Sequence, residues 1–183
     1  VKYSKSFEKW RKKFKLQIAL PSGEASKSLE NFPRLVEKIL HQSERFSSRE
    51  MTILVVGGGT LTDLGGFLAS VIKRGVNLIL IPTTWLAAMD SSHGGKNGLN
   101  ISGYKNQIGT FYFPKKVEIV KEILFMQPPQ RAVEAFGELM KIALISKSNL
   151  FSRLKKSQKI DNEFVYKALP LAIQAKNNVV KKD

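Results

Sequence analysis

The sequence predicts an α/β fold with a parallel sheet and helices on both of its faces, followed by the start of an all-helical domain. Two continuous apolar, β-branched runs, at 52–56 and 76–81, flank a helix-compatible stretch at 63–73. Continuous apolar runs are typical of strands buried on both faces of a parallel sheet, so the three segments form a βαβ unit. Everything after Gln130 has helical periodicity, and we therefore expect an α/β domain at 1–127 and a helical domain from 128 to 183.

Shorter patterns predict the other elements. Phe7, Trp10 and Phe14 are spaced for one face of an amphipathic helix, and Pro33 limits the next helical pattern to one that begins near Asn31. The remaining elements are a short strand at 16–20, a short helix at 85–90, a long Gly-, Ser-, Asn- and Lys-rich loop at 91–106 and a strand at 117–120. A loop of this length is usually functional or disordered.

The composition narrows the function classes. The 183 residues are 43% hydrophobic and contain no apolar run long enough to cross a membrane, which predicts a soluble cytoplasmic protein. Cysteine is absent, so any metal must be held by His, Asp or Glu, and His41 and His93 are the only histidines. The net charge of +15 attracts nucleic acid, acidic membranes or phosphorylated metabolites, and charge alone does not choose among them.

A glycine-rich turn links the first apolar run to the following helix. Gly57, Gly58 and Gly59 let a backbone approach a diphosphate, and the start of the helix offers free N–H groups. Thr62 stands where the dinucleotide fingerprint has its third glycine. A tight structural turn is therefore an equally good interpretation of this motif.

The predicted loop concentrates groups that suit phosphate and carboxylate ligands. Its polar residues include Asp90, His93, Lys96, Asn100, Lys105 and Asn106. Lysines and amides donate to anionic oxygens, and an aspartate beside them can orient a hydroxyl. The alternative is a solvated loop, and a single histidine is more often a hydrogen-bonded structural residue than a ligand.

The first helix after Gln130 carries Glu138 and Lys141 on the same side. We expect the apolar face of this helix to be formed by Val133, Phe136, Met140 and Leu144. The Glu–Lys spacing is typical of an exposed ion pair, and one glutamate does not make a zinc site, which needs at least three protein ligands.

Together, several short motifs resemble the 3-dehydroquinate synthase family in order and spacing, over about residues 20–144. The motifs are Ser22-Gly23-Glu24 with Lys27, the turn from Gly57 to Asp63, Arg74-Gly75, Pro82-Thr83-Thr84, Asp90-Ser91-Ser92 through Lys96, Lys105-Asn106, and Glu138 with Lys141. The resemblance implies a Rossmann-like sheet and an enzyme that uses NAD and a divalent metal, zinc or cobalt. Such enzymes convert 3-deoxy-D-arabino-heptulosonate 7-phosphate to 3-dehydroquinate and phosphate in the shikimate pathway of aromatic amino acid biosynthesis.

The resemblance also implies roles for single residues. It places Glu24 and Lys27 at the adenosine end of NAD, Gly58, Gly59, Thr60 and Asp63 at its diphosphate, and Thr83 and Thr84 on its nicotinamide side. It places Asp90 and Lys105 where cofactor and substrate meet, and Lys96 and Asn106 on the anionic groups of the substrate. Lys141 would also contact the substrate, and Arg74 would reach the phosphate bound in a neighbouring subunit. Glu138 would be a ligand of the metal. Lys96 and Lys105 are expected to contact the cofactor as well.

The implied partners are a phosphorylated keto-acid and a second copy of the chain in a homodimer, with no nucleic acid and no membrane. The substrate's phosphate and carboxylate would account for part of the positive charge.

Three features depart from the family's pattern. The family's other two metal ligands are histidines beyond Asp183, and its opening strands are absent, so we expect a fragment. The family has a small apolar residue at His93, Thr at Asn97 and Tyr-Gly at Ile142-Ala143. Two alternatives stay open: another sugar-phosphate cyclase or glycerol-type dehydrogenase, and an inactive remnant that binds through its positive charge.

Overall fold

A three-stranded parallel sheet forms the centre of the α/β part. The computed structural model describes residues 9–10, 12–146, 149–155 and 159–180. Strand β1 (Thr52–Gly57) pairs with β2 (Asn77–Pro82), and β2 pairs with the short β5 (Lys116–Val117), in the order β1-β2-β5. Helix α3 (Gly59–Val71) connects β1 to β2 and packs against both strands. The predicted α/β class and its parallel sheet are confirmed.

Helix α3 begins four residues before the predicted start at Asp63. Glycine has a low helix propensity, so the periodicity omitted Gly59 from the helix. Close packing explains the glycines of this region: a Cβ at Gly57 would lie 2.6 Å from the Leu61 side chain, and a Cβ at Gly65 would lie 2.3 Å from that of Val55. Gly65 therefore lets α3 lie directly on β1.

The segments before β1 only partly match the prediction. Helix α2 (Phe32–Ser43) begins as predicted, with Pro33 in its first turn, and follows two short 3-10 helices, η1 (Glu24–Lys27) and η2 (Leu29–Asn31). The strand predicted at 16–20 is wrong, because this segment does not join the sheet. Leu16 and Ile18 instead pack against the core between α2 and the sheet. Phe7 lies outside the described residues.

The long loop predicted at 91–106 is wrong. After the π-helix η4 (Ala87–Ser91), which overlaps the predicted short helix at 85–90 and ends one residue beyond it, the chain forms an antiparallel hairpin of β3 (Lys96–Ile101) and β4 (Tyr104–Phe111). Ser102 and Gly103 both have positive φ, which suits a two-residue hairpin turn. The hairpin leaves most of β4 exposed, so its sequence is polar and carries little apolar periodicity.

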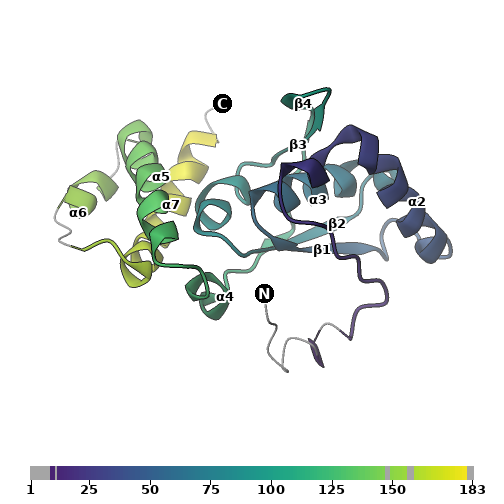
Figure 1. Ribbon diagram of the computed structural model, residues 1–183, viewed down its shortest axis with the longest axis horizontal. Coiled ribbons are helices and arrows are strands. Elements are labelled where there is room, and N and C mark those ends of the chain that lie inside the picture. The colour runs from purple at the N-terminus through teal and green to yellow at the C-terminus, as the bar shows by residue number, and fades with distance from the viewer. Residues whose placement is uncertain (1–8, 11, 147–148, 156–158, 181–183) are drawn as a thin grey trace.

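Asn97 joins the base of the hairpin to the rest of the molecule. Its side-chain amide donates to the carbonyls of Gly95 and Tyr112, at 2.7 and 2.9 Å. The Asn97 side chain also fills the space beside Gly66 of α3. Helix α3 therefore packs directly against the hairpin. The tip of the hairpin projects from the body of the protein (Figure 1).

The residues described after β5 form four helices, and α5–α7 lie at the end of the molecule away from α2 (Figure 1). They are α4 (Lys121–Phe125), α5 (Gln130–Ser146), α6 (Leu150–Lys155) and α7 (Asn162–Val180). The predicted apolar face of α5 is only partly right: Phe136 and Met140 pack against the core of these helices, whereas Val133 and Leu144 are 57% and 63% exposed. The buried face is instead rich in alanine, because α5 packs closely against α7: Ala132, Ala135, Leu139, Ile142 and Ala143.

The core of these helices includes residues from the α/β part. Trp85, Met89 and Leu124 belong to the same buried cluster as the inner faces of α5 and α7. The indole N–H of Trp85 also donates to the Asn162 side chain at 3.2 Å. The boundary at 127/128 stays a prediction. None of the described helices is long and apolar enough to cross a membrane.

Candidate functional site

The glycine turn and the segment after β2 meet at the carboxyl edge of the sheet. The main-chain N–H of Thr83 donates to the Gly57 carbonyl at 2.9 Å, and a Cβ at Gly58 would lie 3.1 Å from the Thr84 side chain. A Cβ at Gly59 would meet only the Ser91 hydroxyl, at 3.6 Å. Next to Gly59, the first turn of α3 has main-chain N–H groups without helical partners. This edge can receive an anionic group at a helix N-terminus.

An ion pair connects η1 to the first turns of α3. The Lys27 ammonium lies 2.6 Å from the Asp63 carboxylate, and Lys27 is buried. Burial raises the pKa of Asp63, and the hydrogen bond and charge of Lys27 oppose that rise. Two residues 36 positions apart are thereby held beside the glycine turn.

Glu24 lies at the centre of a hydrogen-bonded chain. Its carboxylate accepts from the Thr60 hydroxyl at 3.1 Å and from the Asn100 amide at 2.8 Å. The Asn100 side-chain oxygen in turn accepts from the main-chain N–H of Asn106 at 3.0 Å. The hydrogen bond from Asn100 is the largest cause of a lowered pKa at Glu24, and the charge of Lys105 contributes. The chain links η1, α3 and the hairpin.

Asp90 lies on η4 and faces the helical part. One of its carboxylate oxygens is 2.5 Å from the ammonium of Lys176 on α7. The neighbouring Ser91 hydroxyl is 2.9 Å from that of Thr62 on α3. The charge of Asp90 also raises the pKa of both Asp63 and Lys141, although other causes are larger in each case. Asp90 is therefore close enough to influence both parts of the site.

Glu138 and Lys141 form an ion pair on α5, with 2.5 Å between the carboxylate and the ammonium. The hydrogen bond from Glu138 is the largest cause of the raised pKa of Lys141. The Glu138 side chain is only 16% exposed, so this is not the fully solvated pair that its spacing suggests. Together with Lys176, the pair extends the charged groups around Asp90 onto two helices.

Sequence reasoning missed Lys176. It is one of thirty basic residues, and nothing in the pattern around it marks it out. It lies 86 positions from Asp90, and only the packing of α7 against η4 brings the two together. A Cβ at Gly94 would lie 3.8 Å from the Lys176 side chain, so the turn after Asp90 also contacts it.

Two predicted residues are not brought into this cluster. Lys96 is exposed at the base of the hairpin, with its ammonium 5.9 Å from the centre of the Phe111 ring. Arg74 is exposed in the 3-10 helix η3 (Ile72–Arg74), at the end of α3 away from the glycine turn. A role for Arg74 in a neighbouring subunit stays a prediction.

The described residues do not form a complete metal site. They contain no group of three or more His, Asp or Glu side chains that could hold a metal ion. Glu138 is the one predicted ligand, and a zinc site needs at least three protein ligands. This set therefore does not fit a bound metal on its own.

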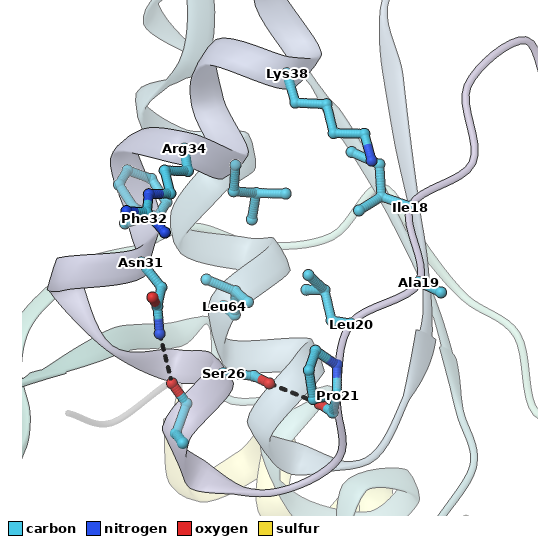
Figure 2. Close-up of a pocket in the computed structure, with 12 residues that line it drawn as sticks. Ile18, Ala19, Leu20, Pro21, Ser26, Asn31, Phe32, Arg34, Lys38 and Leu64 are labelled. Atoms are coloured by element: carbon cyan, nitrogen blue, oxygen red, sulfur yellow. Dashed lines mark hydrogen bonds between the residues drawn. The ribbon is translucent and has the colours of Figure 1, made fainter.

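A separate pocket of about 380 Å³ lies between α2 and residues 18–21 (Figure 2). Its wall is largely apolar, with Leu20, Phe32 and Leu64, and Arg34 and Lys38 lie at its edge. None of the predicted site residues lines this pocket. The charged cluster described above is therefore the candidate functional site.

The chain is similar to known proteins of one family. The family described as "3-dehydroquinate synthase N-terminal" matches residues 17–134. The chain is 40% identical over 174 residues to a 3-dehydroquinate synthase from Alkaliphilus oremlandii, covering 93% of this chain and 47% of that protein. It is 37% identical over 182 residues to one from Picrophilus torridus, covering 100% and 51%. The chain thus spans about half the length of these relatives.

Solved structures show the same fold. A 2-deoxy-scyllo-inosose synthase complexed with carbaglucose-6-phosphate, NAD+ and Co2+ has a TM-score of 0.75 and 27% identity, over 89% of this chain and 45% of that one. An iron-containing alcohol dehydrogenase from Thermotoga maritima shares the fold at 14% identity and a TM-score of 0.64, over 88% and 52%. The chain belongs to the 3-dehydroquinate synthase family, in the region of that family's N-terminal domain.

Proposed function

We propose that this chain is the cofactor-binding part of a 3-dehydroquinate synthase. One observation carries the proposal: the glycine turn, the Lys27–Asp63 pair and the Asp90–Lys176 pair lie around the carboxyl edge of β1 and β2. Ligands of open parallel sheets bind at this edge. The family membership supports NAD as the ligand.

On the cofactor side, Gly58 and Gly59 would let the diphosphate approach the N-terminus of α3. Glu24 and Lys27 would hold the adenosine end, and Thr83 and Thr84 the nicotinamide side. NAD, when bound, supplies a reversible hydride acceptor. The buried ion pair between Lys27 and Asp63 would keep this surface in shape before the cofactor arrives.

On the substrate side, the ammonium groups of Lys141 and Lys176 suit a phosphate or carboxylate. Asp90 lies within reach of Lys176 and would orient a substrate hydroxyl. Lys96, Lys105 and Asn106, on the hairpin, would close over the anions, and Arg74 would act in a neighbouring subunit of a homodimer. A metal would bind Glu138 together with ligands that the described residues do not supply, so no step is assigned to it.

A glycine substitution tests the cofactor site. Gly59→Ala adds a methyl group that meets only a hydroxyl at 3.6 Å, so the protein should fold, but the methyl occupies the space where a diphosphate would approach. We expect NAD+ to bind at least about tenfold more weakly, as measured by isothermal titration calorimetry. Gly137→Ala on α5 is the matched control, because nothing lies within 4 Å of its added methyl. Equal affinities for the two variants would contradict a diphosphate at Gly59.

The reaction is tested by phosphate release from 3-deoxy-D-arabino-heptulosonate 7-phosphate, with NAD+ and with zinc or cobalt. Release would establish the synthase activity for this chain. Release only from another sugar phosphate would favour a different cyclase, a possibility supported by the 27% identity to the 2-deoxy-scyllo-inosose synthase. NAD+ binding without release would identify a cofactor-binding part. The absence of both NAD+ binding and phosphate release would favour an inactive remnant.

A further inference from the structure

The turn that carries Asp90 has an irregular backbone. At the end of η4, the main-chain N–H of Ser92 donates to the Ala87 carbonyl and that of His93 donates to the Asp90 carbonyl, both at 3.1 Å. Nε2 of the His93 side chain contacts the Ala88 carbonyl, which lies between these two carbonyls in the sequence, at 3.0 Å. Ala88 is fully buried, so its carbonyl needs a donor from the protein.

This contact fixes the form of the imidazole. A carbonyl oxygen only accepts hydrogen bonds, so Nε2 of His93 must carry a proton. Burial lowers the pKa of His93, and the positive charge of Lys176 acts in the same direction, whereas the hydrogen bond to Ala88 and the charge of Asp90 oppose the shift. The net lowering of the pKa favours the neutral ring.

We propose that His93 is a positioning residue. Its hydrogen bonds hold residues 88–93, the Asp90 turn, in the observed conformation and so keep the Asp90 carboxylate beside the Lys176 ammonium. Its side chain is tied to Ala88 on one side of Asp90, and its main-chain N–H is tied to the carbonyl of Asp90 itself. The next residue, Gly94, packs near the Lys176 side chain. The importance of Asp90 for binding rests on the proposed function, whereas the tie between His93 and Ala88 does not.

The tie can be removed by substitution. A valine side chain carries no hydrogen-bond donor, so His93→Val removes the bond to the Ala88 carbonyl. His93→Gln keeps a neutral N–H donor at a similar distance from the backbone and is the matched variant.

The first measurement is the protonation state of the ring. The chain has only two histidines, so a long-range 1H–15N spectrum contains two imidazoles, and His41→Gln identifies that of the exposed His41. We expect His93 to be in the Nε2–H form at pH 7, because Nε2 contacts the Ala88 carbonyl. An Nδ1–H form would overturn the proposal.

The second measurement is hydrogen exchange at the Ser92 amide, which reports how often the Asp90 turn opens. We expect the Ser92 amide to exchange with solvent about tenfold faster in His93→Val, and within about twofold of the wild-type rate in His93→Gln. NAD+ should bind about fivefold more weakly to His93→Val and with nearly wild-type affinity to His93→Gln. Equal exchange in all three proteins would refute the positioning role. If the wild-type chain does not bind NAD+, the proposed function fails, and the exchange rates still decide the role of His93.

Discussion

Lys27 shows how much a single buried charge depends on its partner. It is 3% exposed and lies 2.6 Å from Asp63, whereas the exposed pair of Lys121 and Glu163 is separated by 3.2 Å. Removing one partner of a buried pair leaves an uncompensated charge. The same change at an exposed pair leaves a charge that water solvates.

We therefore expect Asp63→Asn to lower the free energy of unfolding by about 3 kcal/mol. Glu163→Gln is the control and should change it by less than about 1 kcal/mol. Urea unfolding of both variants measures the difference. Similar losses in the two variants would show that Lys27 finds water or another acceptor when Asp63 is neutral.

Glu24 should give the site a dependence on pH. Its pKa is lowered, so its contribution to stability is fully present above the unfolded pKa, near 4.5, and is lost as pH falls through the lower folded pKa. Asn100→Ala should raise the pKa of Glu24 and reduce this acid dependence, as followed by carboxyl 13C NMR. Thr60→Ala should raise it less, because the Thr60 hydrogen bond is a smaller cause. A larger shift in Thr60→Ala would reverse this assignment.

At the scale of elements, the β3–β4 hairpin depends on a glycine pair. Gly98 and Gly109 lie opposite each other in the ladder, and a Cβ at Gly109 would lie 2.5 Å from the Asn97 carbonyl oxygen. The contacting atom belongs to the backbone, so it cannot move away by a change of side-chain rotamer. The strands can approach this closely only without a side chain at Gly109.

Gly109→Ala should therefore destabilise the protein by about 2 kcal/mol, through forced separation of the strands. Gly137→Ala, in the open interior of α5, should stabilise it by about 0.5–1 kcal/mol, because alanine favours helix. Thermal unfolding compares the two. The hairpin account is wrong if Gly109→Ala melts at or above the wild-type temperature.

At the scale of the whole molecule, the α/β part and the helices share one core. Trp85 and Met89, near the carboxyl edge of the sheet, pack in the same cluster as Leu139 of α5 and Ala172 of α7. A shared core of this kind couples the unfolding of the two parts. The charged groups of Asp90 and Lys176 lie at this same junction, so the site depends on it as well.

Leu139→Ala should lower the free energy of unfolding by about 2–5 kcal/mol, because Leu139 is fully buried. Tryptophan fluorescence, with Trp10→Phe in both proteins so that Trp85 alone is observed, and far-UV circular dichroism should shift to the same midpoint, as expected for one cooperative unit. Leu144→Ala, at an exposed position of the same helix, should change the stability by less than about 0.5 kcal/mol. Two separate midpoints would instead support independent domains divided near 127/128.

The sequence by itself determined the features that depend on neighbours in the chain. The runs at 52–56 and 76–81 became β1 and β2, and Pro33 marked the first turn of α2. The glycine turn lies where the motif placed it. Apolar periodicity, proline and glycine act within a few residues, so a linear pattern records them.

Only the tertiary structure decided the features that need a distant partner. The segment at 16–20 has the pattern of a strand but no ladder, and the polar stretch at 91–106 folds into a hairpin through pairing and through Asn97. The buried face of α5 was set by the close approach of α7, which favours alanine over larger side chains. Lys176 lies 86 positions after Asp90 in the sequence, and only the fold brings their side chains together. Such contacts depend on which surfaces the fold brings together. A local sequence pattern does not show which residues, far apart in the chain, will meet.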